Sequence, residues 1–100
     1  MNMRYKRIYC KEILADGFYM LCETDQSKPI GFFGLSKTNE LHGLFIEPQY
    51  RKQGYAKELL ECLHNYGIRI QTVTSPKNIS MQMLLEKMGY KKWIKYEDST

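Results

Sequence analysis

A short basic loop lies between two apolar stretches of different periodicity, and it carries the residue types best suited to bind an anion. The apolar run 44–46 ends at Glu47 and Pro48, the loop 51–56 reads Arg-Lys-Gln-Gly-Tyr-Ala, and an apolar pattern with helical spacing begins at once behind it. A helix N-terminus presents free backbone N–H groups and the positive end of the helix dipole. Glycine lets a ligand approach the backbone closely. This order of elements predicts a cradle for a phosphate-bearing ligand.

Length and composition fit one small domain. The chain has 100 residues, of which 43% are hydrophobic and 13% aromatic, enough for a real core. We expect a single domain over residues 1–100 with a flexible tail at 97–100. The net charge of +4 is compatible with an anionic ligand or a nucleic acid, but it is also common among ordinary soluble proteins, so it decides nothing.

Several classes of protein are disfavoured. The cysteines Cys10, Cys22 and Cys62 are odd in number and show no CxxC spacing, which argues against a disulfide framework or a metal site and for the reducing cytoplasm. No apolar segment follows the basic N-terminus, so we expect no signal peptide. No run approaches the ~20 apolar residues of a membrane span.

Hydrophobic periodicity predicts a mixed sheet with two helices. Strands are expected at residues 5–14, 18–24, 30–35, 40–47, 68–74 and 90–96. Helices are expected at residues 54–66 and 79–88. The first four strands form an antiparallel meander, whose first hairpin turns at Asp16-Gly17 with positive φ at both residues. A helix joins the fourth strand to the fifth, so these two should be parallel. The predicted class is α/β (α+β), with a mixed, mostly antiparallel six-stranded sheet.

The fourth predicted strand leads directly into the basic loop. A period of two places His42, Leu44 and Ile46 on one of its faces. The opposite face then carries Leu41, Gly43, Phe45 and Glu47.

Two segments of the chain resemble the motifs of one enzyme family. Residues 51–56 match the [R/Q]-x-x-G-x-[G/A] acyl-coenzyme A-binding motif of the GNAT superfamily of N-acetyltransferases, and residues 78–90 are similar to its second motif, an Asn that opens a helix ending in Gly-aromatic. The resemblance covers residues 18–96. It implies direct transfer of an acyl group, most simply acetyl, from acetyl-CoA or another acyl-CoA to an amine of a small molecule or a protein.

The resemblance also implies which residues hold the co-substrate. In this family the fourth and fifth strands splay apart and the pantetheine arm pairs with the fourth, so the N–H of Ile46 becomes a candidate oxyanion donor. The implied cofactor-binding residues are Leu44, Phe45, Ile46, Arg51, Lys52, Gln53, Gly54, Tyr55, Ala56, Lys57 and Asn78.

The sequence indicates the catalytic residues less directly than the residues that bind the co-substrate. An attacking amine must lose a proton, and the candidate bases are Glu47, His42 and Glu40, in that order. Many family members place a tyrosine, the general acid for the leaving thiolate, seven residues after the helix-opening Asn. That position is Leu85 here, which cannot donate a proton. The alternatives are a hydroxyl group (Ser80 or Tyr55), solvent, a step without an acid, or a protein that is not catalytic.

The acceptor side is expected to be open. Family members usually insert two helices between their first two strands, whereas three residues separate Leu14 from Phe18. We therefore expect a large acceptor, such as a protein amine or a nucleic acid, or a site completed by a second subunit in a homodimer.

Two other functions stay open at this stage. One is a catalytically inactive acyl-CoA- or partner-binding module. The other is a nucleic-acid-binding or nucleic-acid-modifying protein, suggested by the alternation of lysines and aromatics at 91–96. That alternation suits equally well an edge strand protected by lysines, which we favour.

Overall fold

The computed structural model describes residues 2–14, 16–24, 28–72 and 77–90. In chain order its elements are β1 (Met3–Arg4), β2 (Ile8–Leu14), β3 (Phe18–Glu23), β4 (Pro29–Leu35), β5 (Glu40–Ile46), a 3-10 turn η1 (Pro48–Tyr50), α1 (Tyr55–Asn65), β6 (Gln71–Thr72) and α2 (Ile79–Lys87).

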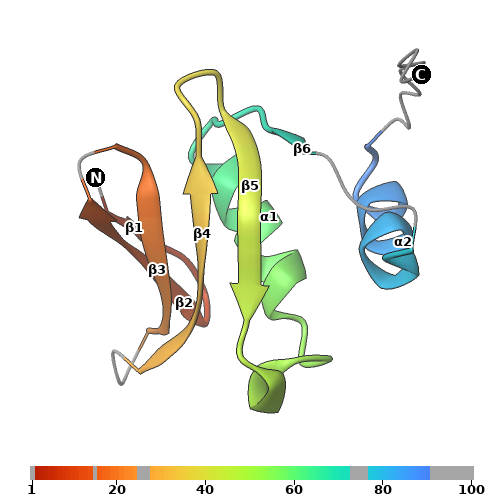
Figure 1. The fold of residues 1–100 in the computed structure, drawn as a ribbon, viewed down its shortest axis with the longest axis horizontal. Coiled ribbons are helices and arrows are strands. Elements are labelled where there is room, and N and C mark those ends of the chain that lie inside the picture. The colour runs from red at the N-terminus through yellow and green to blue at the C-terminus, as the bar shows by residue number, and fades with distance from the viewer. Residues whose placement is uncertain (1, 15, 25–27, 73–76, 91–100) are drawn as a thin grey trace, which may run out of the picture.

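The strands form one six-stranded sheet in sequence order, β1 to β6. All neighbouring strands are antiparallel except β5 and β6, which are parallel through the pairs Glu40–Gln71 and Leu41–Thr72. Helix α1 connects these two strands and lies against one face of the sheet, and α2 follows beyond β6 (Figure 1). The predicted class, a mixed six-stranded sheet with two helices, is confirmed.

The strand boundaries differ from the predicted ones at both ends of the chain. The first predicted strand begins only at Ile8, because Tyr5 turns the chain by donating its N–H to the Ile8 carbonyl (3.0 Å). The residues before this turn form β1, which the sequence did not predict. The fifth predicted strand is reduced to β6, and residues 73–74, the sixth strand from residue 91 onward and the tail 97–100 lie outside the described residues.

The core lies between the sheet and α1. Leucines spaced three and four apart bury one side of the helix, and they meet branched and aromatic side chains from the central strands. The largest fully buried side chains include Leu59, Leu60 and Leu63 of α1 and Ile8, Leu21, Ile30 and Phe33 of the sheet. The cysteines Cys10, Cys22 and Cys62 are buried and free.

Helix α2 is attached more loosely. It has no fully buried residue, although Leu84, Leu85 and Met88 pack partly against the core. Tyr90, just after the helix, stacks on His64 of α1 at 5.5 Å between ring centroids, and its hydroxyl shares a 2.7 Å hydrogen bond with His64 Nε2. Burial raises the pKa of Tyr90 to about 12. Neither α1 nor α2, the helices described, combines the length and apolar character that crossing a membrane requires.

The sheet face opposite α1 carries exposed apolar side chains. Ile13, Phe18, Phe32 and Phe45 are each exposed by more than a third, and no helix within the described ranges covers them. The short β2–β3 connection is confirmed, and Gly17 has the positive φ (93°) that the sequence predicted for it.

Candidate functional site

A bulge in β5 changes which candidate bases share a face. The register with β4 shifts between the pairs Phe32–Phe45 and Gly34–His42, and Gly43 adopts a φ of 63°. The extra residue turns His42 to the uncovered face, where its ring lies over Gly34 and meets Phe18 edge-on at 6.0 Å. The prediction that His42 shares a face with Leu44 and Ile46 is therefore wrong.

The same bulge leaves Leu44 and Ile46 packed against the core side. Phe45 points to the uncovered face, where it stacks on Phe32 at 5.2 Å, and Glu47 lies beyond it on that face. The two first-ranked base candidates, Glu47 and His42, thus lie on one side of the sheet.

The end of β5 has an open edge. The Glu47 N–H donates to the Ile30 carbonyl of β4 (2.8 Å), so by the alternation of an antiparallel ladder the N–H and carbonyl of Ile46 point away from β4. On that side β6 pairs only with Glu40 and Leu41 within the described chain. An extended ligand can pair with the edge at Ile46.

Arg51 contacts this edge directly. Its Nε donates to the Ile46 carbonyl (2.7 Å), and its guanidinium carbon lies 5.3 Å from the centre of the Phe45 ring. The arginine therefore holds the basic loop (residues 51–56) against the end of β5.

The basic loop turns tightly into α1 with two residues in the left-handed region. Lys52 has a φ of 62° and Gly54 a φ of 86°. Only glycine adopts this conformation without strain, so Gly54 suits its position and Lys52 is the strained member of the pair. The Gln53 side chain donates to the Gln49 carbonyl (2.8 Å) and ties the loop to η1.

The N-terminus of α1 has no side-chain cap. Gly54 occupies the N-cap, and the first intrahelical hydrogen bond runs from the Glu58 N–H to the Gly54 carbonyl (3.0 Å). The N–H groups of Tyr55, Ala56 and Lys57 therefore precede the helical ladder and stay available to an anion.

Positive charge surrounds this helix end. Lys52 and Lys57 are exposed, as the sequence suggests. Two further basic residues come from distant parts of the chain. Lys28 lies over the Tyr50 ring at 5.7 Å, and its hydrogen bond to Tyr50 raises the pKa of the lysine. Arg7 reaches Gln53 and Glu58, and no sequence signal indicated it, because it is 51 residues away from Glu58.

The hydroxyl candidates lie apart from each other. Tyr55 is buried, with its ring edge-on to Tyr50 (6.2 Å). Ser80 is exposed in the first turn of α2, and Leu85 is partly buried on the same helix. Asn78 caps α2 as predicted, because its Oδ1 accepts the Met81 N–H at 3.2 Å.

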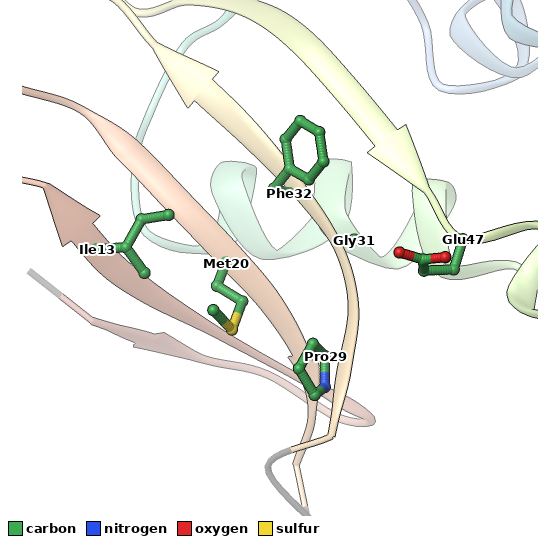
Figure 2. A pocket seen from close by; sticks show the side chains of 6 residues that line it. All are labelled: Ile13, Met20, Pro29, Gly31, Phe32 and Glu47. Atoms are coloured by element: carbon green, nitrogen blue, oxygen red, sulfur yellow. The ribbon is translucent and has the colours of Figure 1, made fainter.

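A hollow of about 180 Å³ lies on the uncovered face next to Glu47. Figure 2 shows side chains from β2, β3 and β4 around it, with the Glu47 carboxylate at its β5 side. The hollow is apolar apart from this carboxylate, and it is lined by Ile13, Met20, Pro29, Gly31, Phe32 and Glu47. Within the described ranges, no three His, Cys, Asp or Glu side chains are grouped as metal ligands would be.

Comparison with known proteins establishes the family of this chain. A family model described as an acetyltransferase (GNAT) domain matches residues 3–97. The chain belongs to the GNAT family. The resemblance inferred from the two sequence motifs is confirmed, and members of this family use an acyl-CoA and an amine acceptor.

Solved GNAT structures share the fold. An acetyltransferase (GNAT family) from Bacillus anthracis superposes with a TM-score of 0.74 at 14% identity, over 89% of this chain and 82% of that one. The structure of AAC(6')-Iy in complex with the bisubstrate analogue CoA-S-monomethyl-acetylneamine gives a TM-score of 0.58 at 24% identity, over 86% and 72% of the two chains.

One curated relative is similar in sequence. The peptidyl-lysine N-acetyltransferase YjaB of Salmonella typhimurium (strain LT2) is 30% identical over 80 residues. These residues are 80% of this chain but only 54% of the relative, so the chain spans about half the length of the relative it matches.

Proposed function

We propose that this protein is an N-acetyltransferase that binds acetyl-CoA through the basic loop and the start of α1. The observation that carries the proposal is the uncapped N-terminus of α1, which lies next to the open edge of β5. The N–H groups of residues 54–57 receive the pyrophosphate, and Lys52 and Lys57 surround it with positive charge. Phe45, Arg51 and Gln53 shape the approach from β5 to this helix end.

The open edge of β5 orients the thioester. The pantetheine arm pairs with the backbone at Leu44 and Ile46, and the Ile46 N–H donates to the thioester carbonyl as negative charge develops on its oxygen. The amine nitrogen then forms a bond to the carbonyl carbon while the carbon–sulfur bond breaks.

Proton transfers complete the reaction. Glu47 takes the proton from the attacking ammonium, because its carboxylate borders the hollow on the uncovered face. His42 lies on the same face and is the second candidate for this role. The leaving thiolate takes a proton from solvent or from the exposed hydroxyl of Ser80, since Leu85 has none to give.

The acceptor is proposed to be a protein amine. The curated relative is named a peptidyl-lysine N-acetyltransferase, and the uncovered face of this chain offers room for a macromolecule. A homodimer whose second subunit covers that face is the alternative arrangement. The basic stretch 91–96, which suggested nucleic acid, lies outside the described residues.

Two measurements test the proposal. Isothermal titration with acetyl-CoA should show binding, and a thiol-release assay with lysine-containing peptides should show turnover. Binding without turnover for any peptide or small amine would identify an inactive acyl-CoA-binding module. Absence of acetyl-CoA binding would refute the proposal outright.

Replacing Glu47 separates binding from catalysis. We expect Glu47→Gln to lower kcat by about 100-fold, the usual worth of a general base, and to leave the acetyl-CoA dissociation constant unchanged. His42→Gln is the matched variant and should have a smaller effect on kcat. A larger loss for His42→Gln would assign the base to the histidine.

A further inference from the structure

Arg7 connects the beginning of the chain to the start of α1. It lies in the turn between β1 and β2, where its carbonyl accepts the Thr24 N–H at 3.0 Å. From there its Nη2 donates to the Gln53 carbonyl (2.8 Å), and its Nε donates to Oε1 of Glu58. Its guanidinium carbon also lies 4.6 Å from the centre of the Tyr55 ring. Contacts with Gln53, Tyr55 and Glu58 hold this side chain against the start of α1.

The bond to Gln53 determines where a neighbouring donor points. In a trans peptide the carbonyl and the following N–H point in opposite directions. Because Arg7 holds the Gln53 carbonyl, the Gly54 N–H is directed away from Arg7 and toward the outside of the helix end. A Cβ on Gly54 would lie 3.3 Å from Arg7 Nη2, so the guanidinium packs directly beneath this peptide.

The ion pair with Arg7 neutralises the carboxylate of Glu58. Glu58 lies in the first turn of α1, close to where a pyrophosphate would bind, and its side chain is only 15% exposed. Its second oxygen, Oε2, is buried without a hydrogen-bond partner among the described residues. An unpaired carboxylate at this position would repel a bound phosphate and weaken its binding.

Arg7 stays charged in this setting. The hydrogen bond to Glu58 is the largest influence on the guanidinium, and it raises the pKa of Arg7 above its ordinary value. The guanidinium is therefore protonated throughout the physiological pH range.

We propose that Arg7 is a positioning residue for acetyl-CoA, which aligns the Gln53–Gly54 peptide and neutralises Glu58. This inference rests on the proposed binding of acetyl-CoA at the start of α1. Arg7 acts through these two groups and needs no contact with the ligand.

Acetyl-CoA titrations of the wild type and of matched variants test the inference. We expect Arg7→Met to weaken acetyl-CoA binding by about tenfold, the effect of one lost charge pair at a partly exposed site. Arg4→Met is the control, because it removes the same charge from the same end of the chain. The Arg4 side chain lies over the Tyr9 ring of β2, and its backbone N–H donates to the hydroxyl of Tyr66, at the far end of α1. Arg4→Met should change the affinity by less than about twofold.

A second substitution distinguishes positioning from folding. Glu58→Gln, introduced into Arg7→Met, should recover a large part of the lost affinity because it removes the unpaired carboxylate. The same double variant should regain only part of the thermal stability, since the contacts of Arg7 with Gln53 and Tyr55 stay lost. The loss in Arg7→Met should also shrink at high salt, which screens a charge effect but not a packing effect.

The outcomes separate this inference from the proposed function. If the wild type does not bind acetyl-CoA, both are refuted. If the wild type binds and Arg7→Met binds equally well, or Arg4→Met loses as much, the role of Arg7 is refuted and the proposed function stands. If Glu58→Gln recovers no affinity in the Arg7→Met background, neutralisation of Glu58 is refuted.

Discussion

The two helices of this protein begin in opposite ways. At α1 the N-cap is Gly54, which has no side chain to satisfy the first N–H groups, whereas at α2 the Asn78 side chain accepts the Met81 N–H. Side-chain capping is the usual way to satisfy a helix start. A helix start left bare beside basic residues is therefore the better place for an external anion, and a capped one is a structural feature.

The packing of the two helices explains why one can do without a cap. Leu59, Leu60 and Leu63 bury one side of α1 completely, so tertiary contacts stabilise that helix whatever happens at its first turn. No residue of α2 is fully buried, and its cap is a larger share of what holds it together. The binding role thus falls to the helix that the core already supports.

The largest expected effect comes from filling the bare helix start. Gly54→Trp should weaken acetyl-CoA binding by at least about 100-fold, because its side chain would meet the Arg7 guanidinium (Cβ to Nη2 3.3 Å) and disturb the loop that presents the free N–H groups. Isothermal titration measures the loss.

A matched glycine at the other end of the same helix is the control. Gly67 also has a positive φ, 77°, against 86° for Gly54, and a Cβ on it would meet nothing within 4 Å. Gly67→Trp should therefore cost similar backbone strain, about 1–2 kcal/mol in the free energy of unfolding, without weakening binding. Equal losses of affinity in the two variants would show that backbone strain, and not a side chain at the start of α1, weakens binding.

A charge reversal in the first turn should have a medium effect. Lys57→Glu places a carboxylate near the proposed pyrophosphate and should weaken acetyl-CoA binding by about tenfold to thirtyfold, less at high salt. Lys37→Glu makes the same change in the exposed β4–β5 turn, and it should leave the dissociation constant within about twofold. Similar losses of affinity in the two variants would show that the net charge of the protein, and not the charge at the start of α1, determines binding.

The smallest effect is expected at the capped helix. Asn78→Ala removes the side-chain acceptor of α2 and should lower the free energy of unfolding by about 1 kcal/mol in chemical denaturation. Asn78→Asp keeps an acceptor and should restore that stability.

The same pair of variants tests whether Asn78 also touches the ligand. If its amide group donates to acetyl-CoA, as the family motif implies, Asn78→Asp restores stability but binds acetyl-CoA several-fold more weakly. Full recovery of affinity in Asn78→Asp would restrict Asn78 to capping and make the contrast between the two helices complete.

Sequence patterns predicted the features that depend on near neighbours. The apolar spacing of α1, the glycine at its start and the cap at Asn78 are each set within one or two helical turns, and each is present in the structure. The parallel pairing of β5 with β6 also follows from the helix between them. The two family motifs lie on these local features, which is why the GNAT family could be inferred without a structure.

Features that depend on strand register were missed. The bulge at Gly43 turns His42 away from Leu44, and a strict period of two has no means to show it. The same limitation applies to β2, whose register with β3 shifts between Glu12 and Leu14.

By itself, then, the sequence determined that a glycine begins α1 and that an asparagine begins α2, because each choice acts through hydrogen bonds to residues within the same turn. Only the tertiary structure decided what lies around the bare start of α1. Arg7 contacts Glu58, which is 51 residues away in the sequence, and Arg51 contacts the end of β5. These contacts exist because α1 packs against the sheet, and packing depends on the whole set of buried side chains, not on any stretch of the chain alone.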